Sequence, residues 1–167
     1  MKFRAIVVAF ATLFTNATMA EPAKVGSTAE LPQPEPEMIQ AVEGAARFVD
    51  TQEDRGLARL FAHKDIVIVD NTAPYVFEGA GAVMTWANMV RAHMHGITEL
   101  RHQFGPAHEY SRRGDRAYFS LPVTWTEYYF GKPVTEKGAW VVVMVREQGA
   151  WKIQHSIWGR TETTPHH

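Results

Sequence analysis

The chain has no cysteine among its 167 residues. Disulfide bonds, thiolate zinc sites, a lipid-modified cysteine and a cysteine nucleophile are therefore excluded. The sequence also lacks a charge bias, because its formal net charge is −1 at pH 7. A nucleic-acid-binding surface usually needs clustered basic residues, so we expect no nucleic-acid partner. Glycine-rich phosphate loops, GxSxG elbows and HExxH helices are missing too, which removes several common enzyme classes.

Long hydrophobic runs are scarce, and the most apolar one lies at the N-terminus. Lys2 and Arg4 flank the start of the apolar run 5–14, and small residues follow at 18–20. This pattern is typical of a signal peptide over residues 1–20, cleaved before Glu21. The run is shorter than the about 20 residues that span a bilayer. We therefore expect an exported protein, periplasmic or secreted, without membrane contact after cleavage; a retained N-terminal anchor is the alternative.

The composition divides the rest of the chain into a tether, one domain and a tail. Residues 21–37 contain four prolines and few apolar side chains, which predicts a disordered tether. Residues 38–160 have the length and hydrophobic content of one domain with its own core. Residues 161–167 are predicted to form a flexible tail, in which His166 and His167 are either native or added residues.

The hydrophobic periodicity predicts an α+β domain. Apolar residues recur at helical spacing over 38–50, 53–63 and 83–95, which predicts three helices. A β-branched run over 66–69 predicts a strand, and a loop or broken hairpin over 73–81 follows it. Strands are predicted over 98–110, 116–130, 139–147 and 151–160, with turns between them. Helices followed by an antiparallel meander are typical of the α+β class.

Three short motifs carry a resemblance to a known family. They are Leu60-Phe61-Ala62 with the following segment 65–70, Phe77-Glu78-Gly79, and the closing hairpin 149–155. In this order they resemble the NTF2-like superfamily, in particular its SnoaL-like and ketosteroid-isomerase-like branch. The resemblance implies a cone in which three N-terminal helices pack in a strongly curved sheet around one small-molecule pocket. It also implies a homodimer through the outer sheet face.

Side-chain alternation along the predicted strands indicates which residues face that pocket. The more apolar row of the last strand contains His155, and the row of strand 98–110 contains His102 and Phe104. The corresponding row of strand 116–130 ends with Trp125, Glu127 and Tyr129. The expected ligand contacts are His155, Trp125, Glu127, Tyr75, Trp86, Phe104 and Tyr129.

The resemblance also implies catalytic candidates. Asp50 and His102 fall where dehydrochlorinase and dehydratase members of the family carry an acidic pocket residue and a catalytic histidine. A histidine with a pKa near ~6.5 can take a proton at neutral pH, and a neighbouring carboxylate can orient it. Asp70 falls where ketosteroid isomerase carries its proton-shuttling aspartate. That enzyme's oxyanion donors would fall near Ala45 and residues 140–141, which cannot serve, so ketosteroid isomerase activity is not expected.

Each candidate has a structural alternative. Asp50 could cap a helix, His102 and His155 could be half-buried structural histidines, and Asp70 could form an Asx-type turn, which we favour for it. His93, His95 and His102 resemble a metal-ligand pattern. Residues two apart on a helix do not face each other, so no metal is expected. No cofactor is expected either.

Three functions remain open from the sequence. The first is a cofactor-free lyase, dehydratase or isomerase that uses His102, Asp50 and Asp70. The second is a non-catalytic binder of a small hydrophobic molecule. The third is an interaction domain with a vestigial pocket. The fold hosts all three, so it cannot decide among them or name the ligand.

Overall fold

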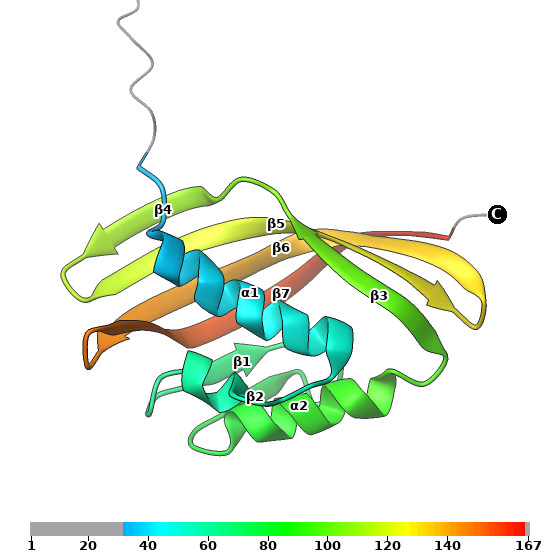
Figure 1. Cartoon of the computed structure of the whole chain (residues 1–167), viewed down its shortest axis with the longest axis horizontal. Helices are drawn as coiled ribbons and strands as arrows, with labels where there is room; N and C mark the ends of the chain where they lie inside the picture. Colours follow the sequence, from blue (N-terminus) through cyan, green and yellow to red (C-terminus); the bar gives the residue numbers. More distant parts are fainter. Residues whose placement is uncertain (1–31, 166–167) are drawn as a thin grey trace, which may run out of the picture. The chain divides into compact units, whose positions relative to one another are not determined.

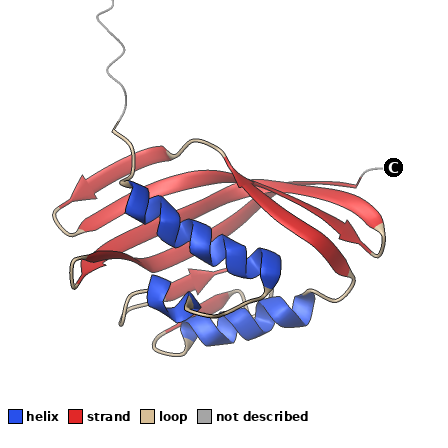
Figure 2. Cartoon of the chain, in the orientation of Figure 1, coloured by secondary structure: helices blue, strands red, loops and turns tan. Residues whose placement is uncertain are grey.

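The computed structural model describes residues 32–165. The predicted signal peptide, residues 21–31 of the predicted tether, and His166 and His167 lie outside the described residues. The elements, drawn in Figures 1 and 2, are α1 (Pro36–Thr51), a 3₁₀ helix η1 (Leu57–Leu60), β1 (Val67–Val69), β2 (Val76–Glu78), α2 (Ala82–His93), β3 (Ile97–Phe104), β4 (His108–Arg113), β5 (Arg116–Tyr129), β6 (Lys132–Glu147) and β7 (Ala150–Pro165).

The strands form one mixed sheet in the order β2-β1-β7-β6-β5-β3, and β4 also pairs with β5. β5, β6 and β7 are long antiparallel neighbours joined by tight turns, while β1 runs parallel to β7. Gly131 and Gly149 occupy two of these turns with φ of 77° and 84°, a conformation that glycine adopts without steric cost. This α+β arrangement confirms the predicted fold class.

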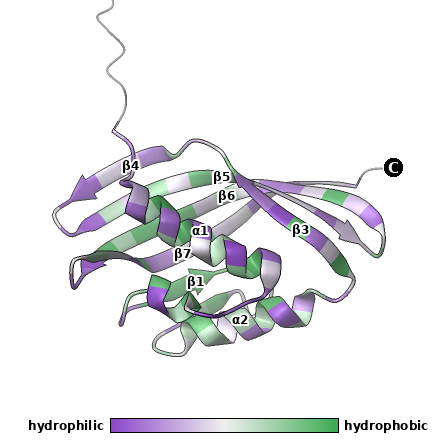
Figure 3. Cartoon of the chain, in the orientation of Figure 1, coloured by the Kyte–Doolittle hydropathy of each residue, from purple (hydrophilic) through white to green (hydrophobic). Residues whose placement is uncertain are grey.

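Helix α1 crosses the sheet, and α2 lies beside β1 and β2 (Figure 1). Pro36 occupies the first turn of α1, where its missing N–H costs nothing. The buried residues of α1 are Met38, Ala41, Val42, Ala45, Ala46 and Phe48, which recur at helical spacing. Figure 3 shows the resulting alternation of apolar and polar stripes along the helix. Within residues 32–165 no helix has the length and apolar character needed to cross a membrane.

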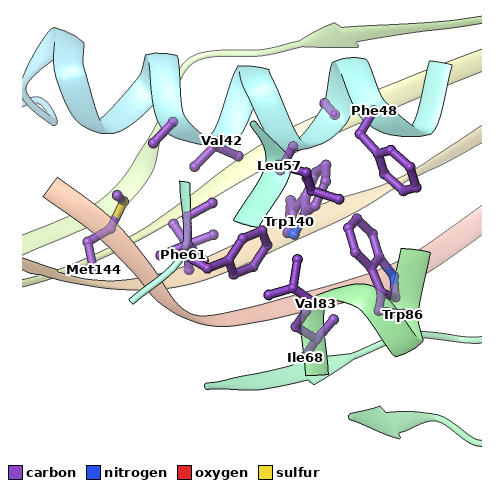
Figure 4. Packing of buried hydrophobic residues seen from close by; sticks show 14 of the residues in the cluster. Val42, Phe48, Leu57, Phe61, Ile68, Val83, Trp86, Trp140 and Met144 are labelled. Atoms are coloured by element: carbon purple, nitrogen blue, oxygen red, sulfur yellow. The ribbon is translucent and has the colours of Figure 1, made fainter. Parts of the chain in front are cut away.

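The core lies between the helices and the sheet (Figure 4). Phe48 of α1 and Trp86 of α2 pack with ring centroids 5.4 Å apart, and Phe61 approaches the same tryptophan at 6.4 Å. Trp140 and Met144 of β6 are buried on the sheet side. Full burial of one such side chain contributes about 1.5–3 kcal/mol to folding. The helices are therefore positioned by large apolar side chains close to the site described below.

The prediction of three helices is wrong in one segment. Residues 53–63 contain only the 3₁₀ helix η1 instead of an α-helix. Gln52 ends α1 with φ 60°, and Gly56 enters η1 with φ 84°, so the backbone is left-handed at both positions. Phe61 is extended and pairs with Ile153 of β7. The apolar residues of this segment are therefore buried without a continuous helix.

Several strands differ in extent from the prediction. The predicted strand 98–110 is divided into β3 and β4 around Gly105-Pro106, because proline cannot donate a ladder hydrogen bond. Segment 73–81, predicted as a loop or a broken hairpin, contains the short strand β2, which pairs antiparallel with β1 as a hairpin does. β7 continues to Pro165 by pairing with the early part of β6, so residues 161–165 form a strand and not the predicted flexible tail.

The irregular pairing of β6 with β7 at Gly138, where the register shifts, predicts a sharp difference between two glycines. A Cβ atom added at Gly138 would collide with the backbone oxygen of Gly159, whereas one at Gly159 has its nearest neighbour 4.0 Å away. We expect Gly138→Ala to lower the free energy of unfolding by about 1–3 kcal/mol, the usual cost of overpacking. Gly159→Ala is the matched control and should change little. Urea unfolding curves measure both, and equal losses in the two variants would contradict the packing argument.

Candidate functional site

A cavity of about 200 Å³ lies between α2 and the ends of β3, β5, β6 and β7. Its apolar lining includes Trp86, Trp125, Trp140 and Trp158, four of the five tryptophans of the chain, together with aliphatic and methionine side chains of α1, α2 and β3. A cavity of about 150 Å³ can hold benzene. This cavity is therefore large enough for a compact molecule with one ring or a short branched chain.

The polar residues of the cavity gather in two places. Asp70, Asn71 and Thr72 follow β1 at one side, and Glu127, Glu136 and Arg160 lie on β5, β6 and β7. Glu136 and Arg160 form an ion pair at 2.6 Å. Burial, followed by the neighbouring charge of Glu136, raises the pKa of the Glu127 carboxyl above its usual 4.5, and the Arg160 charge opposes this shift.

His102 and Asp50 meet outside this cavity. Nδ1 of His102 lies 2.7 Å from Oδ2 of Asp50, and Nε2 lies 2.9 Å from Oε1 of Glu43. Glu43 and Asp50 share one face of α1 because they are about two helical turns apart. The side chains of His102 and Asp50 are 8% and 11% exposed, whereas that of Glu43 is 41% exposed. The histidine thus lies between a buried and a half-exposed carboxylate.

The Asp50 carboxyl is not a helix cap. Gln52 is the C-cap of α1, and its backbone N–H donates to the Phe48 carbonyl, while η1 has no side-chain cap. Burial raises the pKa of the Asp50 carboxyl above 3.8, and the hydrogen bond with His102 opposes that shift. Its other oxygen, Oδ1, is buried and has no hydrogen-bond partner within residues 32–165. The hydrogen bond and charge of His102, with a smaller contribution from the charge of Arg101, therefore offset part of the cost of burying this carboxylate.

Trp125 connects the pair to the cavity. Its ring lies 5.5 Å from the His102 ring, and the same tryptophan lines the cavity. The His102 ring also approaches Phe104 at 5.1 Å. Neither His102 nor Asp50 lines the cavity itself. A molecule in the cavity would therefore contact Trp125 before it could contact the histidine.

Asp70 forms a turn and also lines the cavity. Its Oδ1 accepts a hydrogen bond from the Thr72 N–H at 3.0 Å, the favoured Asx-type turn, and its Oδ2 accepts one from Trp86 Nε1 at 3.0 Å. The carboxylate also lines the cavity. The indole of Trp86 on α2 therefore holds this turn-forming aspartate beside the cavity.

The other expected ligand contacts divide into two groups. Trp86, Trp125 and Glu127 line the cavity. Tyr75 and Tyr129 do not line it. Tyr75 precedes β2 and is 57% exposed, and Tyr129 is the last residue of β5 and is 49% exposed. Phe104 packs between His102 and Trp140 instead of lining the cavity.

The inward position predicted for His155 is wrong because β7 contains a bulge. His155 pairs with Val143 and Ile153 with Met144, so Gln154 is an extra residue in the ladder. After such a bulge the alternation of side chains is reversed. Ser156 is buried and accepts a hydrogen bond from Trp140 Nε1 at 2.6 Å, while Ile157 is exposed.

Sequence reasoning therefore missed Trp158 and Arg160, which line the cavity on the reversed part of β7. His93 is exposed at the end of α2 and also lines the cavity, and its Nδ1–H donates to the Met89 carbonyl at 2.9 Å. Strict alternation gave no signal for Trp158 or Arg160, since one inserted residue changes every following position. Within residues 32–165 no group of three or more histidine, aspartate or glutamate side chains is arranged to hold a metal.

The raised pKa of Glu127 predicts a pH-dependent gain from removing its charge. In the unfolded chain the Glu127 carboxyl loses its proton near pH 4.5, whereas in the folded chain it loses the proton only at a higher pH. The free energy of unfolding of the wild type therefore falls as the pH rises from 4.5 through the raised pKa. The amide side chain of the Glu127→Gln variant does not ionise in this pH range, so the variant does not show this loss of stability. The free energy of unfolding of Glu127→Gln relative to wild type should therefore rise with pH over this interval, as measured by urea titrations. Glu78→Gln, at an exposed carboxyl of β2, should show no such trend.

Comparison with known proteins agrees with this architecture. Residues 35–157 match the SnoaL-like domain. Hexachlorocyclohexane dehydrochlorinase LinA type 2 is similar, with a TM-score of 0.67 and 15% identity over 78% of this chain and 87% of that chain. A scytalone dehydratase-like protein from Novosphingobium aromaticivorans has a TM-score of 0.64 and 16% identity, over 78% and 86% of the two chains.

An NTF2-like protein from Pseudomonas putida is also similar, with a TM-score of 0.59 and 19% identity over 74% of this chain and 83% of that chain. No curated protein matches the chain in sequence. At these identities the solved structures show a common fold, and the domain match shows the family. The chain belongs to the SnoaL-like family and has the NTF2-like fold, with a cavity large enough for a small molecule.

Proposed function

We propose that the protein is a cofactor-free enzyme that moves a proton on a small, largely apolar molecule, as a lyase, dehydratase or isomerase. The observation that carries this proposal is the buried contact of 2.7 Å between His102 Nδ1 and Asp50 Oδ2. A base and the group that orients it must lie within hydrogen-bond reach of each other. Two structural neighbours with eliminating activities in their names, a dehydrochlorinase and a dehydratase-like protein, support the reaction class.

The chemistry follows from the two ring nitrogens of His102. Asp50 accepts the Nδ1–H and so leaves the lone pair on Nε2. Nε2 takes a proton from a substrate carbon, the C–H electron pair becomes the new double bond, and the leaving group departs with its own bonding pair. Asp50 stabilises the imidazolium that results. A positioned base of this kind contributes about 10²–10⁴-fold to a rate.

Glu43 controls whether Nε2 is available. In the structure Nε2 contacts Glu43 Oε1 at 2.9 Å, so a substrate can reach this nitrogen only after the glutamate has turned away. The Glu43 side chain is 41% exposed, and water can replace its contact with the histidine. Exposed ion pairs contribute only about 0–1 kcal/mol, which makes this rearrangement inexpensive.

A second candidate is binding without turnover. It is favoured by the position of Trp125, which lines the cavity and packs on His102, while His102 itself does not line the cavity. In this case the pair of His102 and Asp50 joins β3 to α1, and the tryptophan cavity holds the ligand. Export and a homodimer through the outer sheet face remain predictions from the sequence in both cases.

The experiment that separates the candidates compares activity with binding. The purified protein is incubated with hexachlorocyclohexane, scytalone and related compounds that carry a leaving group next to an acidic C–H, and product is followed by chromatography. We expect turnover of at least one compound and a loss of about 10²–10⁴-fold in His102→Gln. His108→Gln, at an exposed histidine of β4, is the control and should retain activity.

The outcomes of this experiment are distinct. Equal rates for wild type and His102→Gln would rule out the catalytic role of His102. Binding of a compound without any turnover would reject the enzyme and support the second candidate.

Replacing Glu43 tests access to Nε2. Glu43→Ala removes the contact with His102 and should raise kcat/KM by up to about fivefold, because an ion pair with a half-exposed carboxylate contributes about 0–1 kcal/mol. Steady-state kinetics on the compound found above measures this change. Glu37→Ala, near the start of the same helix, is the control. A lower kcat in Glu43→Ala would instead show that Glu43 assists the reaction.

A further inference from the structure

The charges that line the cavity are unbalanced. Three carboxylates line it, those of Asp70, Glu127 and Glu136, against the guanidinium of Arg160 and the imidazole of His93, whose Nδ1–H donates to the Met89 carbonyl. Arg160 is engaged by Glu136 at 2.6 Å. Asp70 is held by neutral donors, the Thr72 N–H and the Trp86 indole N–H. Two carboxylates of the cavity are therefore left without a cation bonded to them within residues 32–165.

Of these two carboxylates, Glu127 has the less favourable surroundings, because Asp70 accepts two hydrogen bonds. Glu127 has no hydrogen bond or ion pair within the described residues, although Arg160 lies close enough to attract it. Burial and the charge of Glu136 raise the pKa of its carboxyl. A cation placed in the cavity would offset this unfavourable environment. The same cavity offers an anion no such gain.

The tryptophans add a second attraction for positive charge. The rings of Trp125 and Trp158 are nearly perpendicular, at 86° with centroids 6.3 Å apart, and Trp140 lies 6.5 Å from Trp125. The face of an indole ring carries negative electrostatic potential, and tryptophan is the best aromatic partner of an ammonium group. Perpendicular rings beside carboxylates are an arrangement that recognises alkylated ammonium groups.

We propose that the cavity binds a compact organic cation, an ammonium group attached to a ring or branched apolar body, with Trp125, Trp158 and Glu127 around the charge. The volume of about 200 Å³ limits the body to one ring or a similar bulk. This inference builds on the proposed function of the same cavity and names the charge of its ligand. It applies whether the ligand is transformed or only bound.

The test uses two probes of nearly the same shape. Benzyltrimethylammonium carries the positive charge, and neopentylbenzene replaces its nitrogen with carbon. Binding to the purified protein is measured by quenching of tryptophan fluorescence and checked by calorimetry at low salt. We expect the cation to bind about tenfold or more tightly than its neutral isostere, as a charge pair in a partly buried site predicts. Benzoate, an anion of similar bulk, should not bind.

Two variants locate the site. Glu127→Gln should weaken binding of the cation by about tenfold and leave the neutral probe unchanged, since only the charge is removed. Glu78→Gln, on exposed β2, is the matched control. Trp158→Leu should also weaken the cation more than the neutral probe. It serves as the second variant if Glu127→Gln does not fold, which circular dichroism shows.

Each result decides the proposal. Equal affinities for the two isosteric probes, unchanged cation affinity in both variants, or no binding of either probe would overturn it. The proposed catalysis is tested separately, by the activity assay on wild type and His102→Gln. A negative result in that assay does not affect the measurements of cation binding. Cation binding without turnover would thus uphold this inference and reject the enzyme.

Discussion

The extra residue in β7 determines the character of the cavity. Because Gln154 has no opposite partner on β6, the residues after it change sides, and Trp158 and Arg160 reach the cavity in place of His155 and Ile157. Trp158 completes the perpendicular pair with Trp125, and Arg160 neutralises Glu136. A regular strand would have presented a histidine and an isoleucine there. The aromatic surface and the charge distribution of the site both follow from this one irregularity.

A second constraint joins the helix layer to the sheet. Glu43 and Asp50 project from one face of α1 and contact the two ring nitrogens of His102 on β3. When the ring is doubly protonated, both N–H groups donate; when it is neutral, one of these contacts loses its hydrogen. The ring of one histidine thus joins α1 to β3, and this link is the same in a catalyst and in a binder. Breaking the buried contact between Asp50 and His102 would leave the Asp50 carboxylate uncompensated and is therefore costly, whereas the contact with the half-exposed Glu43 can be replaced by water.

The sequence predicted the parts of the site that depend on regular periodicity or on family resemblance. The α+β class, both α-helices and the inward row of Trp125 and Glu127 followed from spacing alone, and the positions of Asp50 and His102 came from resemblance. Their contact at 2.7 Å could not be derived from spacing, because it depends on how α1 crosses β3. Neither the left-handed backbone at Gln52, which prevents a second long helix, nor the inserted Gln154 has a hydrophobic signature. These irregular positions account for the wrong helix and for the wrong position of His155.

In the proposed enzyme, Trp125 lies between a ligand in the cavity and the ring of His102. Its ring contacts Trp140, Trp158 and His102, and each aromatic pair contributes about 0.5–1.5 kcal/mol. Turning the ring to open a path from the cavity to His102 would therefore cost a few kcal/mol if no new contact replaced the old ones. A ligand with a millimolar dissociation constant releases about 4 kcal/mol. The binding energy of a modest ligand is thus comparable to the cost of moving Trp125, so a cavity that first captures its ligand could use that capture to expose the base.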